Sequence, residues 1–450
     1  MLFQSLPFLV FFVTFLVALP LFHGLARCIY VTVASYIFYA WWEPRFVPVL
    51  LLLTLFAHHF ANRVHLNRHQ KWIVVALGLV PLALFKYTNF ILENFARLSG
   101  FEIHFHADWR LPLGISFITF TVIAYILDIQ SGRTSREGRF WYSALYIAFF
   151  PHLIAGPILR ARKILPQLPH LGLNRRALKF SGLLFSLGIF KKVVIADQIA
   201  PHVEQAFRGL TTLTQGEALL AFYGFTIQIY CDFSGYSDMA MALALLLGVR
   251  FPINFNSPYL SASFREFWRR WHISLSQWLR DYLYIPLGGG RGSLAQTLFT
   301  LFTTMLIGGL WHGAAWTFVL WGGLHGLFLV VEAVGRHWRI HLPRWLRILL
   351  VVHGVGALWI LFRAPDVTSA ARLILSAFSP GDVGALLANP LPVLLIFLTW
   401  IWHPYDNPSR VRWLAHRIPS RMAYPGILML ILVCAAMTVE NPSAFIYFDF

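Results

Sequence analysis

The sequence predicts an all-α polytopic membrane protein with about 11–12 transmembrane helices, because a bilayer core takes about 20 apolar residues per helix. Of its 450 residues, 58% are hydrophobic and only 12% are charged, and the mean hydropathy is +0.64. Soluble proteins carry about 25% charged residues. Apolar segments recur along the whole chain, so we expect one membrane-embedded domain over residues 1–450, surrounded by membrane lipids. The candidate spans are 6–22, 28–42, 46–61, 72–95, 113–130, 177–200, 217–248, 294–310, 313–334, 347–363, 386–403 and 424–440.

The chain is predicted to begin with a retained span, because Met1–Phe22 has neither a basic leader nor a small-residue cleavage motif. Segment 140–158 is apolar too, but Pro151 and Gly156-Pro157 interrupt it. If this segment re-enters the membrane without crossing it, most of the 36 Lys and Arg residues fall in loops on one side. Such a bias marks the cytoplasmic side and places both termini outside the cytoplasm. Non-helical backbone at that depth requires surrounding protein or water, so a pore or tunnel is implied.

The net charge of +17 does not indicate a nucleic-acid partner, because no predicted soluble domain could present a basic face. We interpret the basic residues as determinants of topology. The three cysteines lie far apart in apolar stretches, which argues against a disulfide framework and a thiolate metal site. A histidine-rich loop has no carboxylate or cysteine beside it, so no metal site is predicted there. Its histidines are His58, His59, His65 and His69.

Residues 264–292 form a basic and aromatic block. Placed on one helix, residues 264–282 present an apolar stripe at helical period, and Arg265, Arg269 and Arg280 lie off this stripe. Such a helix is typical of the membrane interface. A simple interfacial anchor explains the stripe but neither His272 nor the glycines at 288–290, which predict a turn close to a ligand. A functional site and an anchor therefore both stand as interpretations.

Two further histidines, His312 and His325, lie in an apolar stretch rich in glycine and tryptophan. Histidine suits a general base, because its ordinary pKa lies near neutrality and burial can keep it uncharged. The alternative for each histidine is a buried side chain bonded to a neighbouring helix. Glycines here allow close helix packing or a local break.

The segment Asp232-Phe-Ser-Gly-Tyr-Ser-Asp238 puts two carboxylates into an otherwise apolar span. Ionisable groups at membrane depth are costly and therefore indicate function. Because Asp232 and Asp238 are six residues apart, one helix face does not easily hold both. Hydrogen bonding between helices is the alternative to catalysis.

These segments resemble the membrane-bound O-acyltransferase family, in particular its bacterial branch of alginate O-acetyltransferases and teichoic acid D-alanyl transferases. The matching motifs are residues 264–292, Leu310-Trp-His-Gly313, Pro151-His-Leu-Ile-Ala-Gly-Pro157 and residues 232–238, with a signature core at about 230–330. The resemblance implies a ring of tilted helices around a central tunnel, with re-entrant and interfacial helices. It places His272 and His312 in that tunnel, and His312 is the more decisive of the two. The assignment of His325 is less direct.

The resemblance also implies a function in the bacterial cytoplasmic membrane: acetylation of an exported polysaccharide such as alginate or cellulose, with acetyl-CoA as the donor and no bound cofactor. Arginines near the donor could attract its phosphates. An extracytoplasmic esterase-like transferase and an exopolysaccharide assembly complex are the implied partners. Peptidoglycan O-acetylation, D-alanyl transfer, a transporter and a secretion scaffold are the alternatives. The arginines are Arg265, Arg269, Arg270 and Arg291.

The last six residues, 445–450, follow Asn441-Pro442, which should end the final helix. They are too few for another span and too aromatic for a solvated tail. An interfacial aromatic anchor is one interpretation. The pattern Phe-x-Tyr-x-x-Phe also resembles a C-terminal motif of the same branch, which implies that Tyr447 carries the acyl group as a relay.

Overall fold

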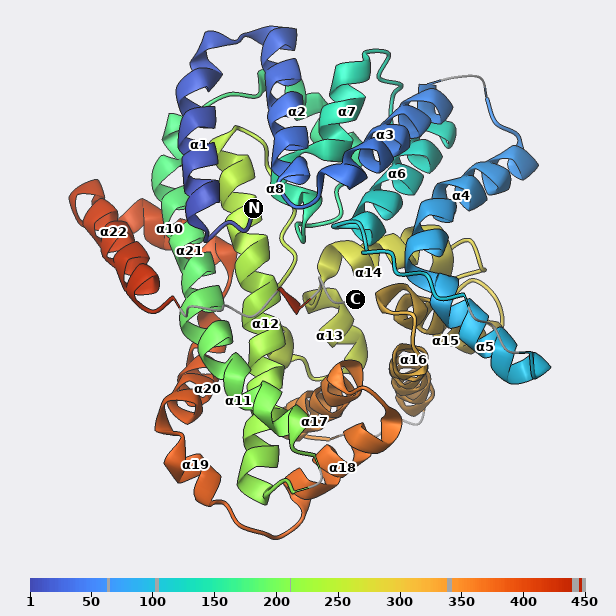
Figure 1. The fold of residues 1–450 in the computed structure, drawn as a ribbon, viewed down its shortest axis with the longest axis vertical. Coiled ribbons are helices and arrows are strands. Elements are labelled where there is room, and N and C mark those ends of the chain that lie inside the picture. The colour runs from blue at the N-terminus through green and yellow to red at the C-terminus, as the bar shows by residue number, and fades with distance from the viewer. Residues whose placement is uncertain (63–64, 102–104, 211, 338–341, 439–444, 447–450) are drawn as a thin grey trace. The chain divides into compact units, whose positions relative to one another are not determined.

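The computed structural model describes residues 1–62, 65–101, 105–210, 212–337, 342–438 and 445–446. Every regular element among these residues is a helix, which agrees with the predicted all-α class (Figure 1). The chain divides into two compact units. The first comprises residues 1–181 and 239–252, and the second comprises residues 182–238 and 253–450. Helices α10 (Leu178–Ile189) and α12 (Gln215–Leu246) contribute residues to both units.

In the first unit, α3 packs against α6 and α7, and α2 packs against α7. The helices wholly within this unit are α1 (Leu6–Ala18), α2 (Gly24–Ala40), α3 (Val47–Asn62), α4 (Arg68–Leu82), α5 (Thr88–Ser99), α6 (Ile115–Gln130), α7 (Phe140–Ala148), α8 (Phe150–Leu153) and α9 (Ala161–Ile164).

The interrupted segment 140–158 does not form one long helix. Helix α7 ends at Ala148, α8 adds only four residues, and the backbone from 156 to 160 is not helical. Nine residues at 1.5 Å each rise about 14 Å, well short of a bilayer core of about 30 Å. The break predicted from Pro151 and Gly156-Pro157 is therefore present.

The second unit holds the remaining helices. Within it, α15 packs on α16, α16 on α13 and α17, and α17 on α18. These helices are α11 (Asp197–Arg208), α13 (Phe264–Arg270), α14 (Ile273–Leu279), α15 (Leu294–His312), α16 (Trp316–His337), α17 (Arg344–Arg363), α18 (Val367–Phe378), α19 (Gly384–Ala388), α20 (Pro390–Trp402), α21 (Pro408–Arg417) and α22 (Ser420–Ala436).

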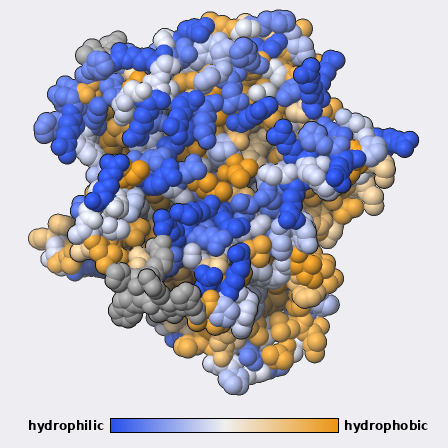
Figure 2. Space-filling view, turned by 180° about the vertical axis from the view of Figure 1, so that it is seen from behind, coloured by the Kyte–Doolittle hydropathy of each residue, from blue (hydrophilic) through white to orange (hydrophobic). Residues whose placement is uncertain are grey.

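The twelve predicted spans fall on helices, except that residues 439 and 440 of the last span lie outside the described residues. The helices are those of a multi-pass membrane protein. Five helical stretches are long and apolar enough to cross a bilayer, and six shorter helices are apolar as well. Many large hydrophobic side chains are exposed, and some of them form the orange patches among the hydrophilic surface in Figure 2. Surfaces of this kind face lipid in membrane proteins, whereas soluble proteins rarely expose large apolar patches. The long stretches are Pro44–Asn62, Arg68–Ser99, Leu294–His312, Trp316–Gly335 and Arg344–Arg363.

Glycines bring α15 and α16 unusually close together. A Cβ atom added at Gly309 would lie 2.3 Å from the carbonyl oxygen of Phe318 and 2.8 Å from the Cα of Gly322. No side chain fits in such a space, so the two backbones touch where these glycines face each other. This contact holds the end of α15, where His312 lies, against the first turns of α16.

The prediction of one continuous helix over residues 264–282 is wrong. Helix α13 ends at Arg270 and α14 begins at Ile273, because Trp271 is extended and His272 is left-handed. The Ile273 N–H turns away to donate to the backbone oxygen of Asn254, at 2.9 Å. Period alone did not reveal the break, since the aromatic spacing continues through it. Most of the stripe is buried inside the protein, including Phe267 and Trp271.

Candidate active site

His272 is fully buried and its backbone is strained. Its φ of 41° lies in the left-handed region, which a non-glycine residue rarely adopts. Strain of this kind concentrates at functional sites. His272 is the residue directly before α14. The backbone N–H of Ser276 in α14 donates to the His272 carbonyl at 3.0 Å.

The side chain of Asn254 fixes the tautomer of His272. Its Oδ1 accepts the Ser274 backbone N–H at 3.0 Å and the Ser274 hydroxyl at 2.9 Å, which identifies this atom as the oxygen. The Nδ1 of His272 lies 3.3 Å from the same oxygen and must therefore carry the hydrogen. Burial lowers the pKa of His272 to about 3. The ring is thus neutral at physiological pH, with its lone pair on Nε2.

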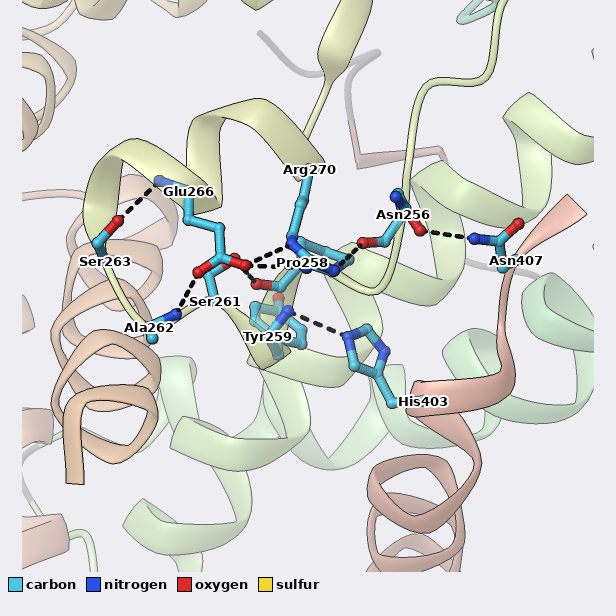
Figure 3. A network of polar contacts seen from close by, with 10 residues as sticks. All are labelled: Asn256, Pro258, Tyr259, Ser261, Ala262, Ser263, Glu266, Arg270, His403 and Asn407. Atoms are coloured by element: carbon cyan, nitrogen blue, oxygen red, sulfur yellow. Dashed lines mark hydrogen bonds and ion pairs between the residues drawn. The ribbon is translucent and has the colours of Figure 1, made fainter. Parts of the chain in front are cut away.

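A polar network supports the segment that leads to His272 (Figure 3). Glu266 pairs with Arg270 at 2.8 Å and accepts the Ala262 N–H at 2.9 Å. Arg270 also donates to the carbonyl of Asn256 at 3.2 Å, and Asn407 donates to the side-chain oxygen of Asn256 at 2.6 Å. These contacts tie α13 to the preceding loop and to the residues before α21, so Arg270 has a structural role.

The other three predicted arginines, Arg265, Arg269 and Arg291, are exposed. The glycines at 288–290 form the expected turn: φ is 114° at Gly288 and 56° at Gly289. A Cβ at Gly288 would lie 2.5 Å from the side-chain nitrogen of Gln296 on α15. The turn therefore closes on the start of α15.

His312 is the last residue of α15 and is buried among aromatic rings. Its ring centroid lies 5.0 Å from that of Trp321 on α16 and 5.4 Å from that of Phe362 on α17. Trp321 also packs on His325, at 4.6 Å. The structure thus brings His312 and His325 together as two neighbours of one tryptophan.

His325 is also fully buried, with Trp268 and Phe267 of α13 beside it. Neither of its ring nitrogens has a hydrogen-bond partner among the described residues. The alternative interpretation of His325, a buried histidine hydrogen-bonded to a neighbouring helix, therefore has no support among the described residues.

Ring contacts connect His272 with His312. Trp271, next to His272, packs on Trp359 of α17 with centroids 4.8 Å apart, and Trp359 packs on Trp321 at 5.8 Å. A continuous aromatic cluster therefore separates the two histidines. Such rings exclude water and hold both imidazoles in fixed orientations.

Both aspartates of α12 pair with lysines of the neighbouring π-helix, Phe190–Ala196. Lys192 lies 2.8 Å from Asp232, and Lys191 pairs with Asp238. All four side chains are buried. Bonding between helices, the alternative to catalysis, is thus what the structure contains at these positions.

The lysine pairs continue beyond α12. Lys192 also contacts Asp197 at 2.8 Å, and Lys191 contacts Asp406 at 3.2 Å. Asp406 in turn accepts the hydroxyl of Tyr230. Lys191 and Lys192 both lie within the predicted span 177–200. A charged side chain within a span is a signal of a functional or structural pair. Asn254 and Asp406 carried no such signal.

The C-terminal segment reaches the second unit's core at Phe445 and Ile446, both buried. Phe445 packs on Tyr236 and Phe233 of α12, with centroids 5.1 and 5.9 Å apart. Phe233 meets His272 edge-on at 4.7 Å. Tyr447, the predicted relay, lies outside the described residues.

Comparison with known proteins agrees with the family resemblance of the sequence motifs. Residues 138–365 match the MBOAT, membrane-bound O-acyltransferase family. The chain is 42% identical to the probable alginate O-acetylase AlgI of Azotobacter vinelandii, over 85% of this chain and 79% of that protein. It is 36% identical to the peptidoglycan O-acetyltransferase of Helicobacter pylori, over 77% and 72%. The teichoic acid D-alanyltransferase of Bacillus subtilis is 27% identical, over 68% and 86%. The chain belongs to the membrane-bound O-acyltransferase family.

Proposed function

We propose that this O-acyltransferase moves an acetyl group from cytoplasmic acetyl-CoA through the membrane for O-acetylation of an exported polysaccharide such as alginate. The single observation that supports this most is the burial of His272 and His312 in one aromatic cluster, in a chain related to alginate O-acetylases. A charged CoA cannot cross a bilayer, so thioester and hydroxyl have to meet inside the protein. A tunnel within a ring of helices provides that meeting place.

In the proposed chemistry, His312 is the general base. Its imidazole takes the proton of the attacking hydroxyl while that oxygen bonds to the thioester carbonyl carbon. The carbon–sulfur bond then breaks, and the departing thiolate receives the proton as CoA thiol. Removal of bulk water by the surrounding rings would limit hydrolysis of the thioester.

We assign His272 the role of orienting the acyl donor. Two roles are open to this residue: orientation of the acyl donor, and stabilisation of the oxyanion as a hydrogen-bond donor. With Nδ1–H directed at Asn254, the lone pair of the neutral ring lies on Nε2. An acceptor nitrogen can receive a hydrogen bond from an amide N–H of the CoA thioester but cannot donate one to an oxyanion, so orientation of the donor is the role that fits. The attacking hydroxyl is that of Tyr447, which then passes the acetyl group on from its aryl ester.

Donor binding would involve exposed arginines. Arg265, Arg269 and Arg291 are accessible and could attract CoA phosphates, whereas Arg270 is already paired with Glu266. No substrate role is assigned to Asp238, since it pairs with Lys191.

The proposed topology has both termini outside the cytoplasm of a bacterial cell and residues 140–158 re-entering the membrane. A single cysteine at Arg175, in a chain without native cysteines, should then be labelled only from the cytoplasmic side, since this position follows the re-entrant segment. An impermeant maleimide applied to right-side-out and inverted membrane vesicles makes the comparison. Labelling from outside would reverse the orientation of every later loop.

We further propose that a separate extracytoplasmic esterase-like transferase, with a Ser-His-Asp site, passes the acetyl group to the polymer within an exopolysaccharide assembly complex. Mass spectrometry of surface polymers from cells with and without the gene tests the function. O-acetyl groups on an exopolysaccharide should disappear when the gene is deleted. Loss of acetyl groups from peptidoglycan would instead favour the second candidate, which the Helicobacter pylori relative supports. Purified chain that acetylates polymer efficiently alone would contradict the partner.

A further inference from the structure

Six buried ionisable side chains form two groups around the π-helix, and the proposed chemistry uses none of them. Lys191 pairs with Asp238 and Asp406, and Lys192 pairs with Asp232 and Asp197. π-helical turns inside α-helices are frequent at functional sites. Here the π-helix places two consecutive lysines beside different aspartates of the same neighbouring helix.

One of these groups is joined to the C-terminal segment. Oδ1 of Asp232 lies 2.8 Å from the Lys192 ammonium, and Oδ2 accepts the backbone N–H of Ile446 at 2.8 Å. Asp232 is almost fully buried, at 1% exposure, so its hydrogen bond with the Ile446 N–H is shielded from water. Among the described residues, no contact joins Asp238 to the C-terminal segment.

Apolar contacts to α12 also fix the same segment. Phe445 packs between Phe233 and Tyr236 on the turn of α12 that carries Asp232, and Phe233 packs on His272. The residue after Ile446 is Tyr447. Asp232 therefore bonds to the residue just before the proposed acyl carrier. Phe233, the residue after Asp232, contacts His272.

We propose that Asp232 is a positioning residue that holds the C-terminal segment against α12 and so places Tyr447 for acyl transfer. This inference rests on the proposed function, because it gives the segment a role in that reaction. Only a carboxylate serves both neighbours here: one oxygen faces the lysine and the other accepts the N–H. The nearby Lys192 ammonium compensates the charge of the buried carboxylate, which would be costly to bury alone.

The test measures segment docking separately from activity. The three native cysteines are replaced by alanine, and Ile446→Cys introduces one thiol at a site that is 8% exposed. Asp232→Asn keeps the size of the side chain but leaves only one acceptor oxygen. Maleimide labelling of the introduced thiol should become about tenfold faster or more, as expected for loss of one charge-assisted hydrogen bond. Asp238→Asn is the matched control, because it removes a lysine-paired carboxylate of the same helix and should leave labelling unchanged.

The activity assay uses the full chain with its native Ile446. Asp232→Asn should lower kcat by about tenfold or more, with the KM for acetyl-CoA within about twofold, because the fault lies in the segment and not in donor binding. An introduced thiol that stays protected in Asp232→Asn overturns the positioning role. Faster labelling with unchanged kcat overturns the link to transfer, while the acyltransferase function itself stands. Failure of that function appears differently, as no acetyl transfer by the wild-type chain.

A second variant covers the case in which Asp232→Asn fails to fold. Ile446→Pro removes the N–H donor and leaves α12 untouched. Phe445→Cys alone gives the reference labelling rate, because it removes the ring packing of the segment, and Ile446→Pro added to it should raise this rate further. In a chain with native Phe445, Ile446→Pro should lower kcat in the same way as Asp232→Asn. A labelling rate no faster than the reference contradicts the role of the Asp232 hydrogen bond.

Discussion

His312→Ala should lower acyl transfer by about 10²–10⁴-fold, the range that a positioned general base contributes. The imidazole lies at the end of α15, enclosed by Trp321 and Phe362. Among the described residues, His325 is the one other base that packs on the same tryptophan. Alanine removes the base and leaves the close glycine packing of α15 and α16 intact. Release of CoA thiol from acetyl-CoA in membranes that contain the variant measures the loss.

His353→Ala is the matched control for this prediction. His353 lies on α17 of the same unit and bonds to the hydroxyl of Tyr223 at 2.9 Å, away from the aromatic cluster. Its removal should leave transfer within about twofold, while costing about 1 kcal/mol of stability for the lost hydrogen bond. Equal amounts of both variants in the membrane confirm folding. Normal turnover by His312→Ala would remove this residue from the mechanism.

Tyr447→Phe should abolish delivery of acetyl groups to the polymer. The substitution keeps the ring and deletes only the hydroxyl that would carry the acyl group, so an aromatic anchor tolerates it and a covalent relay does not. Mass spectrometry of wild-type protein exposed to acetyl-CoA should also find an acetyl group on the C-terminal peptide, and none in the variant.

Tyr424→Phe provides the comparison, because it removes a hydroxyl from an exposed tyrosine on α22. This variant should keep the wild-type rate. If Tyr447→Phe does so as well, or if the C-terminal peptide is never acetylated, the relay is wrong and direct attack by the acceptor replaces it.

The sequence was sufficient to predict most of the fold, because hydropathy directly reports which segments suit a bilayer. Within the described residues, the twelve predicted spans fall on helices, and the break at Pro151 is present. It failed at α18 and α21, which lie outside the predicted spans. The 12 residues of α18 are apolar but too few to span a bilayer, and the 10 residues of α21 are both few and largely polar.

The candidate site was predicted in its residues but not in its local geometry. His272 stood out because of its composition, yet the left-handed turn depends on Asn254, 18 residues away, and nothing in the local spacing reveals that contact. Asp232 and Asp238 were visible as charges in a span. Their lysines were visible too, but the pairing required knowledge of which helix lies beside α12.

The buried lysines have a consequence for how the chain enters the membrane. A lysine at the centre of a span costs roughly 2.5–3.5 kcal/mol to insert, and Lys191 and Lys192 are adjacent in the π-helix. Lys192 bonds to Asp197, which is five residues later in the chain. Lys191 bonds to Asp238 and Asp406, which are 47 and 215 residues after it, so both of its partners are synthesised later. We therefore expect this span to insert incompletely at the translocon until the helices that carry the partner aspartates have been synthesised. Chains that stop before α20 should be early targets for membrane proteases.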